Sequence, residues 1–135
     1  DLGLKVPNKL DSDASISVVS YASFFRIIFN ASYLDKEKSE KLLEILSRSD
    51  FKDGLVAGVP SKITVSHKFG ERELVGNGGA LGNSVQLHDC GIVYYPDRPY
   101  LLCIMTKGNN FKSLASTIGN ISQKIYAEID RKYGK

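Results

Sequence analysis

The stretch TVSHKFGERE, residues 64–73, decides how this chain is interpreted. Residues 62–69 alternate between apolar and polar side chains, with the period of two that is typical of a half-buried β-strand. The alternation ends at Lys68, Phe69 and Gly70, and charged residues follow. A lysine at a strand end, close to a glycine, either lies in solvent or faces a pocket. The rest of the sequence has to indicate which of these surroundings Lys68 has.

Two further strands are predicted after this one. Residues 85–95 (VQLHDCGIVYY) and 100–106 (YLLCIMT) lie on either side of PDRP, a turn with a proline at both ends, and predict an antiparallel hairpin. In the register expected from this turn, Cys90 lies near Met105 and diagonal to Cys103. Diagonal neighbours cannot be cross-linked without distortion, so we expect two small buried apolar side chains and no disulfide.

A helical hairpin is predicted before the strands, in residues 18–49, where apolar side chains recur at helical spacing. The first helix is expected to stop near NASYL, and the second to begin at Asp35, a good N-cap. The predicted inward residues are Ser20, Phe24, Phe25, Ile27, Ile28 and Leu34 in the first helix, and Leu42, Leu43, Ile45 and Leu46 in the second.

The last predicted element is a long amphipathic helix over residues 112–133, which is expected to lie across the sheet. Its predicted inward face consists of Leu114, Ile118, Ile121, Ile125, Ile129 and Tyr133. Residues 1–17 are polar and irregular and predict a loop, and a short connector ends at Gly58 and Pro60. The order helix, helix, three strands, helix indicates a single α+β domain with an antiparallel sheet.

The composition excludes several classes of function. A hydrophobic content of 42% and a charged content of 24% are ordinary for a globular domain. The net charge of +3 is mild and the basic residues are scattered, so we expect no nucleic acid and no membrane surface as partner. The cysteines match no metal-ligand spacing, and the Gly-rich residues 71–84 lack the Lys-Ser/Thr end of a phosphate loop. We therefore expect no metal and no organic cofactor.

The order of these elements, together with HKFG at residues 67–70, resembles the C-terminal half of the class A β-lactamases and the related penicillin-recognising serine hydrolases. In that family a strand ends in Lys-Thr/Ser-Gly, and the serine nucleophile lies in Ser-x-x-Lys on a separate helical region. Lys68 and Gly70 match the strand motif, and Phe69 stands where the hydroxyl residue usually is. The connector GLVAGVP, the two strands after it and the last helix are also similar.

The resemblance implies a β-lactamase/transpeptidase-like fold that is incomplete, and a reaction by acyl transfer on β-lactam or D-Ala-D-Ala-type amides. Lys68 would be the cation that binds the substrate carboxylate and helps a neighbouring proton transfer. Gly70 would let the backbone approach the substrate, and the backbone N–H of Glu71 would donate in the oxyanion hole. Phe69 lies at a substrate-binding position but has no hydroxyl, so weaker binding of ordinary penicillins is expected.

Three polar side chains near the motif are assigned other roles. His67 points to the opposite face from Lys68 by strand alternation, so it is expected to pack rather than to react. His88 is interpreted as a surface or strand-end residue. Asp89 matches an acidic position common in the family and is expected to fix strand geometry.

No Ser-x-x-Lys at a helix start and no Ser-Asp-Asn occurs in the chain, so the chain alone should be inactive. We expect as its partner an N-terminal half that carries Ser-x-x-Lys, or a second copy bound through residues 100–106, which would form an unpaired edge strand. A non-catalytic cell-wall-binding or interaction module on the same scaffold is an alternative, and so is an unrelated small α+β interaction domain. The resemblance implies an extracytoplasmic location, in the cell envelope or secreted.

Overall fold

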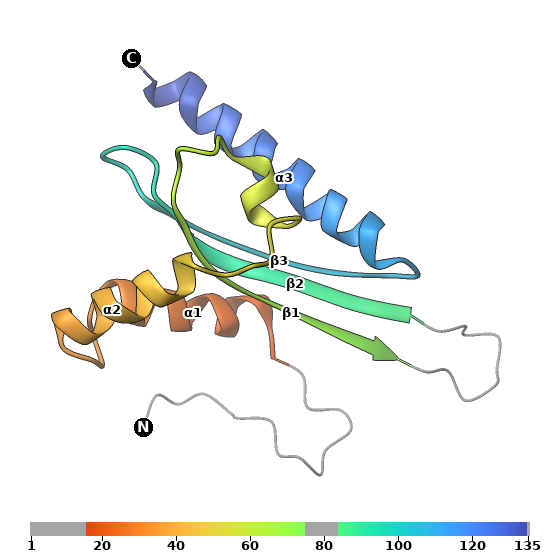
Figure 1. Cartoon of the computed structure of the whole chain (residues 1–135), viewed down its shortest axis with the longest axis horizontal. Coiled ribbons are helices and arrows are strands. Elements are labelled where there is room, and N and C mark those ends of the chain that lie inside the picture. The colour runs from red at the N-terminus through yellow and green to blue at the C-terminus, as the bar shows by residue number, and fades with distance from the viewer. Residues whose placement is uncertain (1–15, 75–83, 135) are drawn as a thin grey trace, which may run out of the picture.

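The computed structural model describes residues 16–74 and 84–134, which form an α+β fold built on an antiparallel sheet (Figure 1). In these residues the helices are α1 (Val18–Phe29), α2 (Lys36–Ser47) and α3 (Phe111–Tyr133), with a short 3-10 helix η1 (Leu55–Gly58). The strands are β1 (Val65–Leu74), β2 (Ser84–Val93) and β3 (Tyr100–Gly108), and the sheet order is β1-β2-β3. The predicted fold class and element order are confirmed.

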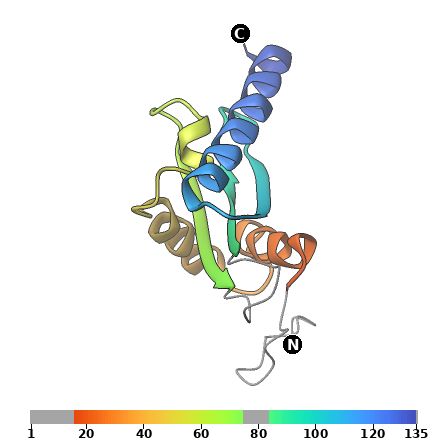
Figure 2. The ribbon, with the colours of Figure 1, turned by 90° about the vertical axis from the view of Figure 1, so that its right-hand side faces the viewer.

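The sheet lies between two helical layers. Helices α1 and α2 cover one face, while α3 and η1 cover the other (Figures 1 and 2). Each face has its own apolar cluster, so the sheet is buried on both sides. The side chains of one strand therefore alternate between two different cores, and the register of the sheet decides which core each side chain enters.

Strand β1 differs from its predicted range. It begins three residues later than expected and continues past Gly70 to Leu74, which pairs with Ser84. The charged residues 71–73 lie outside the predicted strand, but they are exposed on an edge strand, where charged side chains are common. The start of the Gly-rich segment 71–84 is thus strand. Residues 75–83 lie outside the described residues, as do residues 1–15 of the predicted N-terminal loop.

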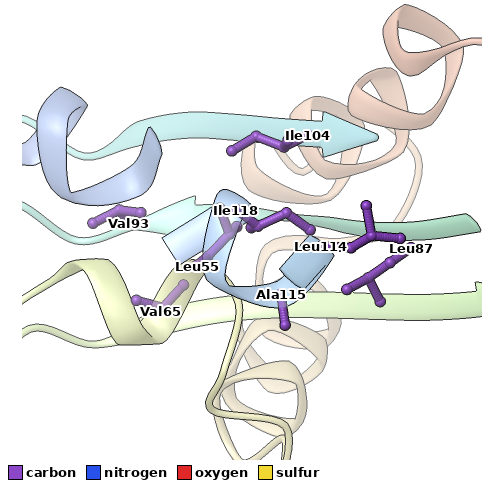
Figure 3. Packing of buried hydrophobic residues seen from close by; sticks show 8 residues of the cluster. All are labelled: Leu55, Val65, Leu87, Val93, Ile104, Leu114, Ala115 and Ile118. Carbon is purple, nitrogen blue, oxygen red and sulfur yellow. The ribbon is translucent and has the colours of Figure 1, made fainter. Parts of the chain in front are cut away.

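The larger core lies between the sheet and α3 (Figure 3). Its buried members are Leu55, Val65, Leu87, Val93, Ile104, Leu114, Ala115 and Ile118. The prediction that Ile121 and Tyr133 face inward is wrong, since 36% and 40% of these side chains are exposed. The buried stripe of α3 is turned toward the small residues Ala115, Gly119 and Ser122, because η1 packs there.

Helix η1 approaches α3 so closely that no side chain fits between the two backbones. A Cβ atom on Gly58 would lie 2.5 Å from the carbonyl oxygen of Gly119 and from the amide nitrogen of Gln123. The Ser122 hydroxyl also donates a hydrogen bond of 2.8 Å to the Leu55 carbonyl. Close backbone contact needs glycine at position 58 and small residues opposite, which accounts for the rotated buried face of α3.

The smaller core lies between the sheet and the first two helices, and consists of Phe25, Leu43, Cys90 and Ile92. The predicted N-cap of α2 is confirmed, since the Asp35 side chain accepts a hydrogen bond from the Lys38 amide. Ile45 was predicted to face inward, but 55% of it is exposed. Leu34 was assigned to the first helix, but it follows the end of α1 at Phe29.

Cys90 and Cys103 form a disulfide, so the prediction of two free cysteines is wrong. The error lies in the register, because Cys90 pairs directly with Cys103, and Met105 pairs with His88. The hairpin closes at Val93 and Tyr100 instead of two residues later. Residues 94 and 95 leave the ladder there, and the Tyr94 amide donates to the Thr64 carbonyl instead of pairing with β3.

The disulfide predicts a stability that depends on redox conditions. Dithiothreitol should lower the free energy of unfolding by about 2–3 kcal/mol, because the cross-link joins residues 13 positions apart and restricts the unfolded chain. The measurement is the urea midpoint of the protein with and without the reductant. The Cys90→Ala/Cys103→Ala variant is the control and should not respond to dithiothreitol. Two free thiols in the untreated protein by mass spectrometry would contradict the assignment.

Candidate functional site

Lys68 lies on β1, which is an edge strand among the described residues. Its side chain is exposed, and Nζ bends back along its own strand to donate a hydrogen bond to the Phe69 carbonyl oxygen. Nζ also lies 4.9 Å from the centroid of the Phe69 ring. The described residues do not enclose this ammonium group, so the cleft expected around it stays a prediction.

Phe69 has its ring on the face of the sheet that α3 covers. The ring stacks on Phe51 with a centroid distance of 4.2 Å and packs against the larger core. Phe51 in turn contacts Phe111 edge-on at 6.1 Å. The ring is thus held by aromatic packing, which stabilises such pairs beyond their burial. Phe69, at the position where the resemblance suggests a hydroxyl residue, is a structural part of the core.

Gly70 pairs directly with His88 of the neighbouring strand. A Cβ atom on Gly70 would lie 2.5 Å from Cε1 and 2.7 Å from Nε2 of the His88 ring, closer than any real contact. The imidazole therefore occupies the space over the glycine. His88 is half-buried in the middle of β2, so its interpretation as a surface or strand-end residue is wrong.

Tyr21 of α1 completes this group, although it was not among the predicted inward residues of the first helix. Its ring meets the His88 ring edge-on at 5.0 Å, and its hydroxyl donates to the Lys68 carbonyl at 3.4 Å. Residues 21, 25 and 28 share one face of a helix, so the helical spacing from Phe25 and Ile28 would have placed Tyr21 against the sheet. The structure thus brings Tyr21, Lys68, Gly70 and His88 together, with Glu71 next along β1 and exposed.

The surroundings of His88 disfavour its protonation. Burial lowers its pKa below the ordinary 6.5, and the charge of Lys68 lowers it further, while Asp89 acts in the opposite direction. Burial, together with Asp89, raises the pKa of Tyr21. At neutral pH both rings are therefore uncharged, and the charge in this group is carried by Lys68.

His67 and Asp89 are fully buried on the other face of the sheet, as predicted for His67. Asp89 Oδ1 lies 2.7 Å from His67 Nδ1, and Oδ2 accepts a 2.9 Å hydrogen bond from the Leu55 amide. Asp89 thereby joins β1, β2 and η1, in agreement with its predicted structural role. His67 Nε2 has no hydrogen-bond partner among the described residues.

The described residues contain neither a metal-binding cluster nor a membrane-spanning helix. Within 16–74 and 84–134, no three His, Cys, Asp or Glu side chains are grouped so that they could hold a metal ion. No helix in the same part of the chain is long and apolar enough to span a membrane.

A sequence model described as the beta-lactamase enzyme family matches residues 4–129. The chain belongs to the β-lactamase enzyme family. This match excludes the unrelated α+β interaction domain that the sequence left open. No match was found among curated proteins.

Solved structures agree with this assignment at the level of the fold. A class A β-lactamase from Bacteroides cellulosilyticus is 19% identical, with a TM-score of 0.71, and the similarity covers 84% of this chain and 41% of that one. A β-lactamase from Chitinophaga pinensis is 20% identical, with a TM-score of 0.69, over 82% and 40% of the two chains. PBP-A is 21% identical, with a TM-score of 0.63, over 83% and 39%.

A variant of PBP-A was solved as an acyl-enzyme complex with penicillin G. The chain spans about 40% of the length of these β-lactamase relatives, so it corresponds to the C-terminal half of a family member.

The buried contacts of Asp89 predict a large effect of its removal. Asp89→Ala should lower the free energy of unfolding by about 3 kcal/mol, because it leaves the buried His67 ring and the Leu55 amide without a partner. Urea unfolding of the protein measures this change. Asp50→Ala, at an exposed position, is the control and should change stability by less than about 0.5 kcal/mol. Equal losses in the two variants would contradict the role given to Asp89.

The electrostatic contact between Lys68 and His88 predicts a measurable titration. Lys68→Gln should raise the pKa of His88 toward 6.5, because one of the two causes that lower it is removed. The proton NMR signal of the His88 ring reports this pKa as a function of pH, and Lys107→Gln on β3 is the control. Because the pKa of His88 is lower in the folded chain than in the unfolded chain, the unfolded chain takes up a proton at His88 first as pH falls below 6.5. The contribution of His88 to stability therefore decreases through that range and becomes constant below the folded pKa.

Proposed function

We propose that this chain is part of a β-lactamase-like serine hydrolase that acts by acyl transfer on β-lactam or D-Ala-D-Ala-type amides. In this proposal the chain supplies the lysine strand and the oxyanion-hole backbone. The family match supports the scaffold. The observation that carries the proposal is the position of Lys68 on an exposed edge strand, just before a glycine, with the neighbouring Phe69 ring turned into the core.

The ammonium group of Lys68 suits the carboxylate that β-lactams and D-Ala-D-Ala peptides share, since a hydrogen bond to a charged group contributes about 1.5–3 kcal/mol. In this structure its partner is a backbone carbonyl of the same strand, which a substrate carboxylate could replace. The backbone N–H of Glu71 is proposed as an oxyanion-hole donor. An edge strand leaves alternate N–H groups without a strand partner, which makes such a donor available.

The serine nucleophile is proposed to come from an N-terminal half that carries Ser-x-x-Lys. This chain corresponds to only about 40% of its structural relatives, which supports a missing segment. Apolar side chains are also left exposed on the outer faces of three elements. They are Val19 at 72% and Phe29 at 41% on α1, Ile45 at 55% on α2, and Leu101 at 36% on β3.

Edge strand β3 is where the N-terminal half is proposed to add its strands. Association of two copies through β3 is the alternative for this edge. The proposed location is outside the cytoplasmic membrane, where peptidoglycan occurs, and the disulfide supports an oxidising compartment.

A non-catalytic cell-wall-binding module on the same scaffold is a second candidate, and Phe69 favours it. The hydroxyl of a Thr or Ser at this position would donate a hydrogen bond to the substrate carboxylate. The Phe69 ring is instead stacked on Phe51 and offers no polar atom. Under the first candidate, Phe69 predicts a substrate other than an ordinary penicillin, or weaker binding of one by about tenfold.

The test is covalent labelling of the full-length protein by a fluorescent penicillin. Lys68→Ala should lower the second-order rate of labelling roughly 10- to 100-fold, as expected for losing a hydrogen bond to a charged group. Lys62→Ala, an exposed lysine before β1, is the matched control and should leave the rate unchanged. The present chain alone should not be labelled.

Equal labelling of the Lys68→Ala and Lys62→Ala variants would overturn the role of Lys68. Binding of peptidoglycan peptides without any acyl adduct by mass spectrometry would favour the non-catalytic candidate.

A further inference from the structure

The His88 ring and Gly70 are directly opposite each other in the sheet. The ring atoms Cε1 and Nε2 lie where a side chain at position 70 would begin. An aromatic ring that packs across strands over a glycine stabilises a position that is otherwise weak in a sheet. From this we propose that the His88 imidazole, supported by Tyr21, is what excludes a side chain at position 70, and that it positions the Lys68–Glu71 segment of β1 for the reaction.

A side chain at position 70 would destabilise the protein little if the His88 imidazole were free to turn away, but other rings pack against the far side of the imidazole. The Tyr21 ring meets it edge-on at 5.0 Å, and Tyr21 meets the buried Phe25 edge-on at 6.2 Å. The three rings therefore form a row from the smaller core to the backbone of β1. A methyl group at position 70 would have to displace this row or push β1 outward.

The same row of rings also contacts Lys68, the residue before Phe69. The Tyr21 hydroxyl donates to the Lys68 carbonyl, two residues from the glycine under the imidazole. Tyr21 and His88 thus hold β1 at two successive residues of the same face, and Glu71 follows directly. A shift of the strand here would move both the ammonium group and the proposed oxyanion-hole amide, and a displacement of about 1 Å can cost about 100-fold in rate.

This assignment differs from the reason that the family resemblance suggests for the glycine, namely close approach of the backbone to the substrate. The two reasons predict different behaviour when space is created on the protein side. If the imidazole excludes the side chain, removing the imidazole makes room for an alanine. If the substrate excludes it, removing the imidazole changes nothing.

The experiment uses the full-length protein and four forms: unsubstituted, Gly70→Ala, His88→Ala and the double variant. The inference rests on the proposed function for its first readout, the saturation kinetics of labelling by a fluorescent penicillin. Gly70→Ala should lower the maximal labelling rate by about 100-fold. Adding His88→Ala should recover about tenfold or more of that loss, with little change in half-saturation. A double variant as slow as Gly70→Ala would overturn the proposal.

Two further variants separate positioning from chemistry. His88→Phe keeps a flat ring over Gly70 and should label within about threefold of the unsubstituted protein, since no titrating group is needed. If His88→Phe lowered the maximal labelling rate as much as His88→Ala does, the imidazole would act through its nitrogens, which would contradict the proposal. Gly108→Ala is the matched control, because its Cβ would meet only Leu114, at 3.1 Å. The change in labelling rate caused by Gly108→Ala should be the same with and without His88→Ala.

The melting temperatures of the same four forms provide a readout that needs no activity. Gly70→Ala should lower the melting temperature much less in the His88→Ala background than in the unsubstituted one. If the unsubstituted protein is not labelled at all, the proposed function fails, and this coupling alone decides whether the ring excludes a side chain. Additive changes in melting temperature would overturn the inference even if labelling occurs normally.

Discussion

The register between β1 and β2 is the constraint on which the rest of this structure depends. It places Gly70 opposite His88 and Lys68 opposite Cys90. Both faces of the sheet are covered by helices, so a slip of one residue would send each side chain of β1 into the wrong core. Phe69 would leave its stack on Phe51, and the polar His67 would enter the apolar cluster around Phe25. The positions of Lys68, Phe69 and Gly70 thus follow from a pairing that packing on two faces enforces.

Asp89 secures this register from the α3 side, and the disulfide extends it to β3. The Asp89 carboxyl group contacts His67 on β1 and the Leu55 amide in η1, so the edge strand and the connector are held to β2 by buried hydrogen bonds. Such bonds matter chiefly because their loss leaves buried polar groups unpaired. Cys90 pairs with Lys68 on the neighbouring strand and is bonded to Cys103 on β3, so the disulfide begins directly opposite Lys68.

The two faces of β1 make different contacts. On the α3 side, Phe69 belongs to an aromatic cluster with Phe51 and Phe111. On the other side, the Tyr21 hydroxyl contacts the Lys68 carbonyl and the His88 ring lies against Gly70. The ring at position 69, where the resemblance suggests a hydroxyl residue, is therefore linked to core packing, since it stacks on Phe51, which in turn contacts Phe111.

The kinds and order of the elements and the N-cap at Asp35 could be predicted from the sequence alone, and so could the resemblance of Lys68 and Gly70 to the family's strand motif. These depend on local spacing and on short-range hydrogen bonds, which a sequence displays directly. The register of the β2–β3 hairpin, the buried stripe of α3, and the contact of Tyr21 and His88 with β1 depend on packing between distant segments and could not be predicted. A proline-bounded turn is compatible with more than one closing pair, and only packing selects Val93 with Tyr100. In the same way, the close approach of η1 turns α3 toward its small residues, because backbone contact between distant segments has no local signal.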